Sequence, residues 1–235
     1  MPRQNHLDQP LGDPVPGWTT RPRPSPSVMQ GRLMRLEPLD SSRHAADLHD
    51  GFSLDADARH WTYLSYGPFA SATDYAQWID GTRTQANELY FAVVDQATGK
   101  PVGVVAYLRI DPAMGSIEVG NLRFSRLLQR KPASTEVMYL MMRHAFDELG
   151  YRRYEWKCDS LNAASLAATK RLGFRFEGIF RNALVAKGNN RDTAWLSITD
   201  AEWPAIKAAF EAWLAPDNFD ATNRQRRRLV DLRPC

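Results

Sequence analysis

The pattern of apolar and polar residues divides the middle of this chain into strands and helices. Its clearest series reads strand, charged link, helix, strand, helix, at residues 116–124, 125–131, 132–149, 152–158 and 162–172. The strands are rich in β-branched and aromatic residues, and apolar residues in the helices recur every three or four positions. Pro132 suits a first helical turn, and Gly150 and Gly173 suit helix ends. Such a unit aims backbone N–H groups at an anion, which is typical of a cofactor site.

The flanking sequence predicts further elements on both sides of this series. Upstream, the pattern indicates strands at residues 31–37, 88–94 and 102–110, and helices at residues 41–50, 55–66 and 71–87. Downstream, it predicts a hairpin with strands 175–187 and 191–198, and a closing helix over 201–214 that Asp200 caps. Together these elements predict one α+β domain over residues 28–214.

The two ends of the chain differ in composition from this domain. Residues 1–27 contain seven prolines and little that could bury an apolar face, which indicates an extended N-terminal arm. Trp18 is the exception, and we expect it to dock on the domain or on a partner subunit, so a homodimer is one alternative. Residues 215–235 are polar and arginine-rich, which is typical of a solvated tail rather than of a segment that binds RNA.

Composition and charge argue against several classes of protein. With 43% hydrophobic and 24% charged residues, the chain is ordinary for a soluble globular protein. A net charge of +3 argues against a broad nucleic-acid-binding face. No apolar run reaches the roughly 18–20 residues of a membrane helix, and no signal-peptide core is present, so we expect a cytoplasmic protein without membrane contacts. Two cysteines, and histidines without metal-ligand spacing, predict no disulfide framework and no metal site.

Three stretches carry motifs with chemical meaning. The second helix combines an asparagine, a small residue, a basic residue and a Gly-Phe ending at Asn162, Ser165, Arg171, Gly173 and Phe174. The first helix opens after a turn that contains a glutamine, two basic residues, a proline and two hydroxyl residues, at 129–135. The strand that precedes this turn, 118–124, begins with a carboxylate.

The order of the elements and these motifs resemble the GNAT superfamily of acyl-CoA-dependent N-acyltransferases, in particular its RimJ/RimL-like branch, which acetylates ribosomal-protein N-termini. The resemblance covers most of residues 28–214. It implies an α/β sandwich in which helices flank a central, mostly antiparallel sheet of about seven strands. It also implies that this sheet splays between its fourth and fifth strands, and that acetyl-CoA is the co-substrate.

The second-helix motif carries the most specific implications. In the family, the asparagine equivalent to Asn162 binds the pantetheine arm of CoA, and one helical side chain lies near the sulfur. Many members have a tyrosine at the position of Thr169, whereas in the ribosomal branch the active serine corresponds to Ser165. The resemblance therefore implies that Ser165 protonates the departing thiolate and that Arg171 contacts the cofactor. Alternatively, Asn162 is an ordinary N-cap and Ser165 has no chemical role.

The turn before the first helix departs from the family pattern. Family members place glycines there, so that backbone amides cradle the pyrophosphate of CoA. Pro132 stands at the first glycine position and lacks an N–H group. The resemblance still implies cofactor contacts from this turn, at Gln129, Arg130, Lys131, Ala133, Ser134 and Thr135. The alternative is a plain helix start with a solvated basic link.

The strand at 118–124 supplies the predicted reaction centre. In the family it carries a bulge and separates from the next strand, and pantetheine pairs with the exposed backbone. Matching positions imply that the backbone of Leu122 and Phe124 binds the arm, and that an amide near Leu122 faces the thioester oxygen. Glu118 is the candidate base, because an alkylammonium group with a pKa near ~10 is not a nucleophile at neutral pH. The alternative for Glu118 is an exposed strand carboxylate.

An acceptor pocket is expected from aromatic residues upstream and one carboxylate downstream, namely Trp61, Tyr63, Tyr66, Trp78, Tyr107 and Asp192. The alternative is that the aromatic residues form core and that Asp192 makes a hairpin salt bridge. Leu184 stands where the ribosomal branch has a candidate glutamate base, which argues against a simple transfer of that mechanism.

These observations predict an acetyl-CoA-dependent N-acetyltransferase that acts on a primary amine by direct transfer in a ternary complex. The acceptor would be a peptide N-terminus or a small amine or amino-acid-like metabolite. Cys158 has no histidine partner in the pattern, so no covalent intermediate is expected. The alternative is a catalytically weak or inactive CoA-binding module, which Pro132, Thr169 and Leu184 favour.

Overall fold

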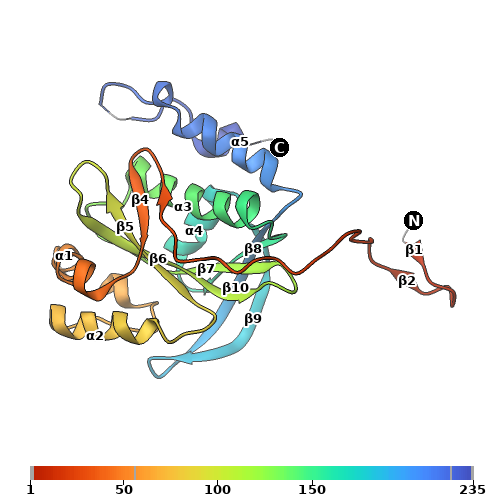
Figure 1. The fold of residues 1–235 in the computed structure, drawn as a ribbon, viewed down its shortest axis with the longest axis horizontal. Helices are drawn as coiled ribbons and strands as arrows, with labels where there is room; N and C mark the ends of the chain where they lie inside the picture. The colour runs from red at the N-terminus through yellow and green to blue at the C-terminus, as the bar shows by residue number, and fades with distance from the viewer. Residues whose placement is uncertain (1–2, 56, 223, 234–235) are drawn as a thin grey trace.

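A twisted sheet lies at the centre of the computed structural model, which describes residues 3–55, 57–222 and 224–233 (Figure 1). Its eight strands lie in the order β3-β4-β5-β6-β7-β8-β10-β9. Their bounds are β3 (Met29–Gln30), β4 (Met34–Pro38), β5 (Leu89–Asp95), β6 (Pro101–Asp111), β7 (Ser116–Phe124), β8 (Arg153–Asp159), β9 (Arg175–Ala186) and β10 (Asn189–Thr199). All neighbours are antiparallel except β7 and β8, which are parallel. The expected mostly antiparallel sheet is confirmed, and its additional strand is the two-residue β3.

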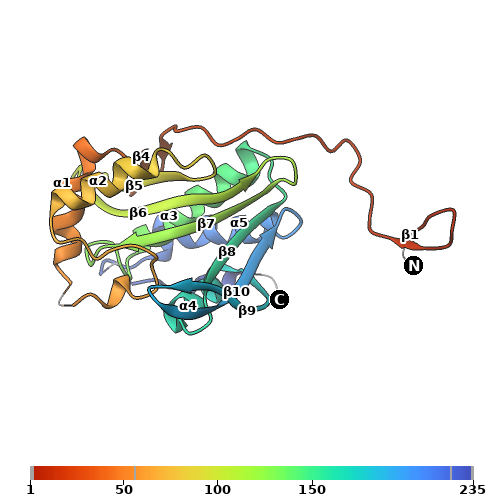
Figure 2. The same ribbon diagram turned by 90° about the horizontal axis from the view of Figure 1, so that it is seen from below.

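Helices cover the two faces of this sheet unequally (Figures 1 and 2). On one face, α1 (Ser41–Ser53) and α2 (Ala72–Thr82) pack on β5 and β6 in a small aromatic core. On the other face, α3 (Pro132–Arg143), α4 (Ala163–Leu172) and α5 (Trp203–Leu214) enclose the main core. The side chains of β8 alternate, so that Tyr154 and Trp156 enter the main core while Arg153, Glu155 and Lys157 point the other way. No helix of the described part packs over Arg153, Glu155 and Lys157. We call this part of the sheet, with the neighbouring side chains of β7, the charged band.

Local sequence explains where most helices begin and end. The side chains of Asp40, Ser71 and Asn162 accept hydrogen bonds from backbone N–H groups at the starts of α1, α2 and α4. Gly173 ends α4 in the left-handed conformation, with φ of 101°. The helix predicted to run to residue 149 ends as an α-helix at Arg143 and continues as the π-turn η2 (His144–Glu148).

Two predictions about helices are wrong. Only the short 3₁₀ turn η1 (Arg59–Trp61) forms where a helix over 55–66 was expected. Asp57 accepts a hydrogen bond from the backbone N–H of Arg59 at 3.0 Å, a local bond that competes with helix formation. Asp200 does not cap α5, because that helix begins after Glu202, whose carboxylate accepts from the N–H of Thr199 at 2.8 Å.

The N-terminal arm runs along the domain and then projects from it. Its first part forms a small hairpin of β1 (Arg3–Gln4) and β2 (Pro10–Leu11) that stands away from the sheet (Figure 2). Trp18 docks on the turn between β6 and β7, where its indole N–H donates to the carbonyl of Ala113 at 3.0 Å. A Cβ atom on Gly115 would lie 2.3 Å from this indole, and its φ is +64°, so the docking site requires glycine there. Trp18 therefore contacts its own domain.

A few apolar residues anchor the segment after α5 to the domain, so its described part is not the free tail that was expected, although the arginines at 224 and 226–228 are exposed as expected. The turns η3 (Pro216–Asn218) and η4 (Leu229–Leu232) lie on either side of an isolated bridge. Leu229 is buried in the main core, and the ring of Phe219 packs edge-on against Trp213. These few apolar residues anchor an otherwise polar segment.

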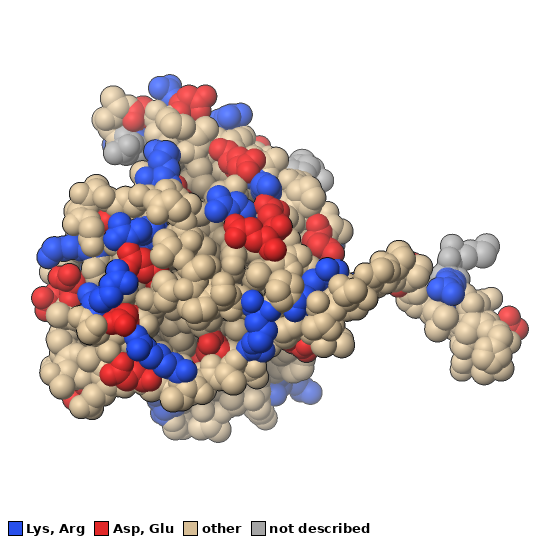
Figure 3. Space-filling view, in the orientation of Figure 1, with Lys and Arg blue, Asp and Glu red and all other residues tan. Residues whose placement is uncertain are grey.

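Charges of both signs mix on the surface in Figure 3, where lysines and arginines lie among aspartates and glutamates. That face carries no continuous basic stripe of the kind that binds nucleic acid. Within the described ranges, every helix is too short or too polar to cross a lipid bilayer.

Candidate active site

The sheet opens between β7 and β8. The first four residues of β7 pair with β8, and the last of these pairs joins Val119 to Trp156. Beyond it, residues 120–124 have no register partner on β8. On the other side of β7, Val104 faces Arg123 while Ala106 faces Gly120, so an extra residue bulges out of β7. Both the bulge and the splay between the fourth and fifth long strands agree with the sequence-based expectation.

The bulge consists of Asn121 and Leu122. Asn121 adopts a left-handed φ of 50°, and its side-chain amide donates to the hydroxyl of Tyr90 at 2.5 Å. The Asn121 carbonyl accepts a hydrogen bond from the hydroxyl of Tyr66 at 3.4 Å. Leu122 thus lies outside the register of both neighbouring strands, which leaves its peptide group beside the splay.

The carbonyl of Phe124 is already engaged. It accepts hydrogen bonds from the Arg123 guanidinium at 2.8 Å and from the side-chain amide of Gln129 at 2.7 Å. Gln129 therefore fixes the end of β7 rather than extending toward an anion. Of the two backbone positions predicted to bind the pantetheine arm, Leu122 is the one that these side chains leave open.

Ser165 lies on α4 at the fork between β7 and β8. The indole N–H of Trp156 donates to the Ser165 hydroxyl oxygen at 2.9 Å. The backbone N–H of Ser165 donates to the side-chain oxygen of Asn162 at 3.1 Å, so Asn162 is an N-cap and its amide N–H groups remain for a ligand. Thr169, at the family's tyrosine position, is fully buried and its hydroxyl donates to the carbonyl of Leu166. Ser165 is the hydroxyl of this helix that can still act as a donor at the fork.

Cys158 lies next to Ser165 in this part of the core. Burial raises the pKa of its thiol, and the polar Ser165 hydroxyl beside it partly opposes that rise. A buried thiol with a raised pKa is a poor nucleophile, which supports the expectation of direct transfer.

Glu118 lies on the opposite side of the sheet from Ser165, in the charged band. It is only 2% exposed, so the alternative of an exposed carboxylate is wrong. Arg109 lies 2.6 Å from one of its oxygens and the ammonium of Lys157 lies 3.0 Å from the other. Lys157 also pairs with Glu155 at 2.8 Å and lies 3.8 Å from the ring centre of Trp195. Burial raises the pKa of Glu118, although the charges of Lys157 and Arg109 oppose that rise.

The turn that should bind the cofactor's phosphates keeps only part of its predicted donors. Pro132 occupies the first turn of α3 and has no N–H group. The Ser134 hydroxyl donates to the carbonyl of Lys131 at 2.7 Å, and Ala133 is buried. Arg130, with a left-handed φ of 58°, and Lys131 remain exposed at the start of the helix. Two cations and a helix N-terminus are what this turn can offer a pyrophosphate.

Thr135 and Arg171 bind each other. The Arg171 guanidinium donates to the Thr135 hydroxyl at 3.0 Å and lies 5.0 Å from the ring centre of Trp213. This contact joins α3 to α4 and explains both residues without a ligand.

Four of the six predicted acceptor residues lie on one side of the splay. Tyr66 and Trp78 stack with ring centres 4.2 Å apart, beside the bulge. Trp61 packs edge-on against Tyr66 and lines a cavity of about 160 Å³ next to α1. Tyr63 is 40% exposed and reaches across the fork, where its hydroxyl donates to the carbonyl of Leu161 at 3.2 Å. These four residues surround one side of the splay.

Two predicted acceptor residues do not join this group. Tyr107 is fully buried in the main core, and its hydroxyl donates to the carbonyl of Met141 at 2.6 Å. Asp192 accepts from the N–H of Asn182 at 2.7 Å and from the side chain of Asn190 at 3.0 Å, which braces a bulge between β9 and β10. Asp192 forms no salt bridge with any described residue, so the alternative of a hairpin salt bridge is wrong.

Three residues that the sequence did not single out hold this site together. Lys187, in the β9–β10 turn, donates to the carbonyls of Trp61 and Gly67 at 2.8 and 2.9 Å and so closes the hairpin over the acceptor side. Lys157 and Arg123 neutralise buried carboxylates from within strands. A charged residue inside an apolar strand is the only signal that could have pointed to the last two. Among the described residues, no group of three or more His, Cys, Asp or Glu side chains could hold a metal ion.

Comparison with known proteins assigns the whole arrangement to one family. The model of the acetyltransferase (GNAT) domain matches residues 34–175. A GCN5-related N-acetyltransferase from Brucella melitensis is 45% identical, with a TM-score of 0.90 over 93% of this chain and 99% of its own. A probable GNAT-family acetyltransferase from Chromobacterium violaceum is 39% identical, with a TM-score of 0.78 over 84% of this chain and 98% of its own. RimL, a ribosomal L7/L12 α-N-protein acetyltransferase solved with CoA, shares the fold at 20% identity and a TM-score of 0.62, over 74% of this chain and 98% of its own. No curated protein matches significantly.

Proposed function

Since this chain belongs to the GNAT family of acetyltransferases, we propose that it transfers the acetyl group of acetyl-CoA directly to a primary amine. The observation that carries the proposal is the arrangement at the fork. Trp156, in the last pair before the splay, holds Ser165 on the α4 side of the sheet. Trp156 pairs with Val119, and the residue before Val119, Glu118, faces the other side of the sheet with its carboxylate buried. A proton donor and a proton acceptor thus flank the opening from opposite faces.

Each group then has one role. Glu118 takes the proton of the acceptor ammonium, directly or through a water molecule, and the free amine forms the new C–N bond to the acetyl carbon. The peptide N–H near Leu122 faces the thioester oxygen, where negative charge develops. As the C–S bond breaks, the Ser165 hydroxyl supplies a proton to the thiolate, a good leaving group with an intrinsic pKa of ~8.5. The attacking nitrogen loses its second proton as the amide forms, and that proton, relayed through water, restores the Ser165 hydroxyl, while Glu118 keeps the first. The products are an amide and the free CoA thiol.

The residues present fit acetyl-CoA better along the pantetheine arm than at the pyrophosphate. The open edge at Leu122, the Ser165 hydroxyl and the free amide of Asn162 line the fork. At the other end, Arg130 and Lys131 must compensate for the missing N–H of Pro132. We therefore expect affinity to depend strongly on the pantetheine arm.

The proposed acceptor is the amine of a peptide N-terminus or of an amino-acid-like molecule. Its support is the mixture of charged and aromatic side chains around the splay. The Glu118–Lys157 ion pair joins β7 to β8 just before the strands separate, and Tyr66, which stacks on Trp78, contacts the bulge of β7. RimL acts on a protein N-terminus, and peptides with a free N-terminus are the natural first class of acceptor to test.

Calorimetry with acetyl-CoA tests the proposal first, with desulfo-CoA and ATP as controls. We expect micromolar binding of acetyl-CoA and desulfo-CoA and much weaker binding of ATP, which lacks the arm. Turnover is then measured with short peptides and amino-acid amides. Tight binding without turnover on any amine would favour the alternative, an inactive CoA-binding module, which the occupied Phe124 carbonyl and Pro132 also support. Absence of acetyl-CoA binding would refute both.

Ser165→Ala should lower kcat about tenfold, which is less than general-acid catalysis usually contributes, because a thiolate departs readily even without a strong donor. The affinity for CoA should stay within about threefold, since the N-cap bond uses the Ser165 backbone and survives the change. Ser160→Ala, in the loop before α4, is the matched control and should leave kcat unchanged. A normal kcat in Ser165→Ala would reduce Ser165 to an acceptor for the Trp156 indole.

A further inference from the structure

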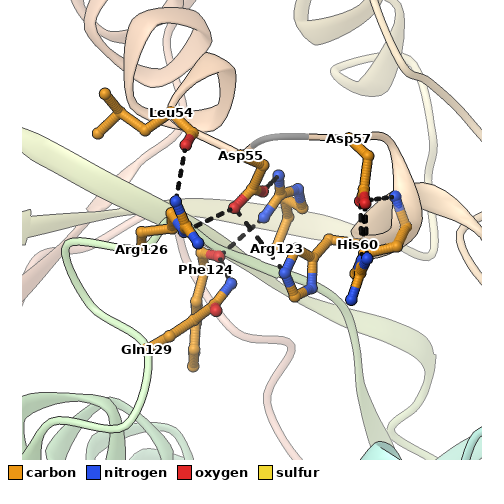
Figure 4. Close-up of polar contacts among 9 residues, drawn as sticks. Leu54, Asp55, Asp57, His60, Arg123, Phe124, Arg126 and Gln129 are labelled. Carbon is orange, nitrogen blue, oxygen red and sulfur yellow. Dashed lines mark hydrogen bonds and ion pairs between the residues drawn. The ribbon is translucent and has the colours of Figure 1, made fainter.

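Arg123 follows the bulge directly and is the largest side chain among those that are fully buried in the described part. Its guanidinium donates to a carboxylate oxygen of Asp55 at 2.5 Å and to the carbonyl of Phe124 at 2.8 Å (Figure 4). The same group lies 4.4 Å from the ring centre of Phe52 and 4.7 Å from that of Trp61. A single side chain thus contacts the cofactor-binding edge of β7, the end of α1 and the acceptor side of the site.

Asp55 reinforces this connection from the other side. Its side chain is 5% exposed, and its second oxygen lies 3.7 Å from Arg126 and 3.8 Å from the imidazole of His60. Arg126 also donates to the carbonyl of Leu54 at 3.2 Å. Figure 4 shows these side chains converging from the loop after α1 and from the link between β7 and α3. The two segments are therefore joined by ionic and hydrogen-bonding contacts at their adjacent ends.

The loop held in this way returns to the reaction centre. After His60 it carries Trp61, then Tyr63, whose hydroxyl binds the carbonyl of Leu161 beside Asn162. It continues to Tyr66, whose hydroxyl binds the carbonyl of Asn121 in the bulge. The contacts form a closed ring, from the bulge through Arg123 and Asp55 to the acceptor loop and back to the bulge.

Stability alone does not explain a buried ion pair at this position. Removing two charges from water costs about as much as their attraction returns, and apolar residues of similar size often support a fold equally well. A guanidinium differs from an apolar side chain in its planar, directional donors, which orient several partners at once. Here those donors orient one partner in each segment, Phe124 and Asp55.

We propose that Arg123 is a positioning residue that couples the acceptor loop, residues 57–66, to the cofactor-binding edge of β7. When CoA binds this edge, the backbone of the edge becomes less mobile. Because Arg123 and Asp55 connect the edge to the acceptor loop, the loop becomes less mobile as well. Binding of the first substrate therefore prepares the site for the second. The inference rests on the proposed function, because it assumes that CoA binds at the open edge of β7.

Hydrogen–deuterium exchange of the full-length protein, with and without saturating CoA, tests the coupling. In the wild type, CoA should slow exchange in residues 57–66 about tenfold, within the usual range of coupling between sites. In Arg123→Met this protection should fall below about twofold, although CoA still protects the backbone around Leu122. Arg123→Lys should retain an intermediate effect, because it keeps the charge but not the planar donors. Arg59→Met, which removes an exposed cation from the same loop, should behave like the wild type.

The outcomes separate the two levels of the proposal. If CoA protects neither segment in the wild type, the proposed cofactor site fails. If CoA protects Leu122 and its neighbours but leaves 57–66 unchanged, or if Arg123→Met keeps the full loop protection, the coupling is refuted. Asp55→Asn provides a second variant that removes the charge at nearly constant shape, in case Arg123→Met does not fold. It should likewise lose the loop protection.

Discussion

Replacing Glu118 with glutamine should lower kcat/KM about 100-fold or more at neutral pH, because the variant cannot take the proton of the acceptor ammonium. Its pH–rate profile should also change shape. The carboxylate acts as a base only when ionised, so the wild-type rate should fall as the pH drops through the pKa of Glu118. Burial raises that pKa, so this fall in rate, the acidic limb of the profile, lies closer to neutral pH. In Glu118→Gln the limb should disappear.

A matched control separates catalysis from the loss of an ion pair. Glu155→Gln also removes a carboxylate from Lys157, but on the neighbouring strand. Its kcat/KM should stay within about threefold of the wild type, with the acidic limb still present. The stability of both variants is measured by thermal unfolding. An acidic limb that persists unchanged in Glu118→Gln would assign the base to another group.

Glu136→Ala should be the most destabilising single change that we predict. The Glu136 carboxylate is buried and accepts hydrogen bonds from three consecutive backbone N–H groups, those of Arg32, Leu33 and Met34, at 2.9, 2.7 and 2.7 Å. Alanine leaves these donors without a partner, at a cost of about 3 kcal/mol in the free energy of unfolding. For a chain of this size, that corresponds to a fall in Tm of about 10 °C.

The control for this prediction is a surface glutamate beyond the other end of α3. Glu148→Ala breaks a looser pair with Arg143, at 3.6 Å, in which the Glu148 side chain is 52% exposed. It should change the free energy of unfolding by less than about 1 kcal/mol. Denaturant unfolding of the two variants compares them directly. Equal stabilities would show that the loop at 31–34 finds other acceptors when Glu136 is absent.

Most of the fold could be predicted from local sequence. Asn162, Ser71 and Asp40 cap helices because their side chains accept from nearby N–H groups, whatever the rest of the chain does. The predictions of local structure failed at two places. At 55–66 the side chain of Asp57 satisfies the N–H of Arg59 without a helix, and after residue 214 a few apolar residues dock a segment that reads as polar.

The candidate site was predictable only in part. Ser165 and the bulge at Leu122 lie where the motifs placed them, and membership of the GNAT family follows independently from the family match over 34–175. The roles of Gln129, Thr135 and Tyr107 were not predictable, because their partners are the carbonyl of Phe124, the guanidinium of Arg171 and the carbonyl of Met141. In the last two cases the partner lies more than thirty residues away.

By itself the sequence determined the properties that depend on neighbours along the chain: the periodicity of each strand and helix, the caps, the turn residues and the spacing of Asn162, Ser165 and Gly173. The tertiary structure alone decided which side chains are buried together. From the sequence, Glu118 is either a candidate base or an exposed strand carboxylate, and only folding buries it against Arg109 and Lys157. Nothing in the sequence singles out Arg123, which Asp55 and two aromatic rings surround in the folded chain. The cost of burying a charge depends on partners that arrive from other elements, and these partners meet only in the folded chain.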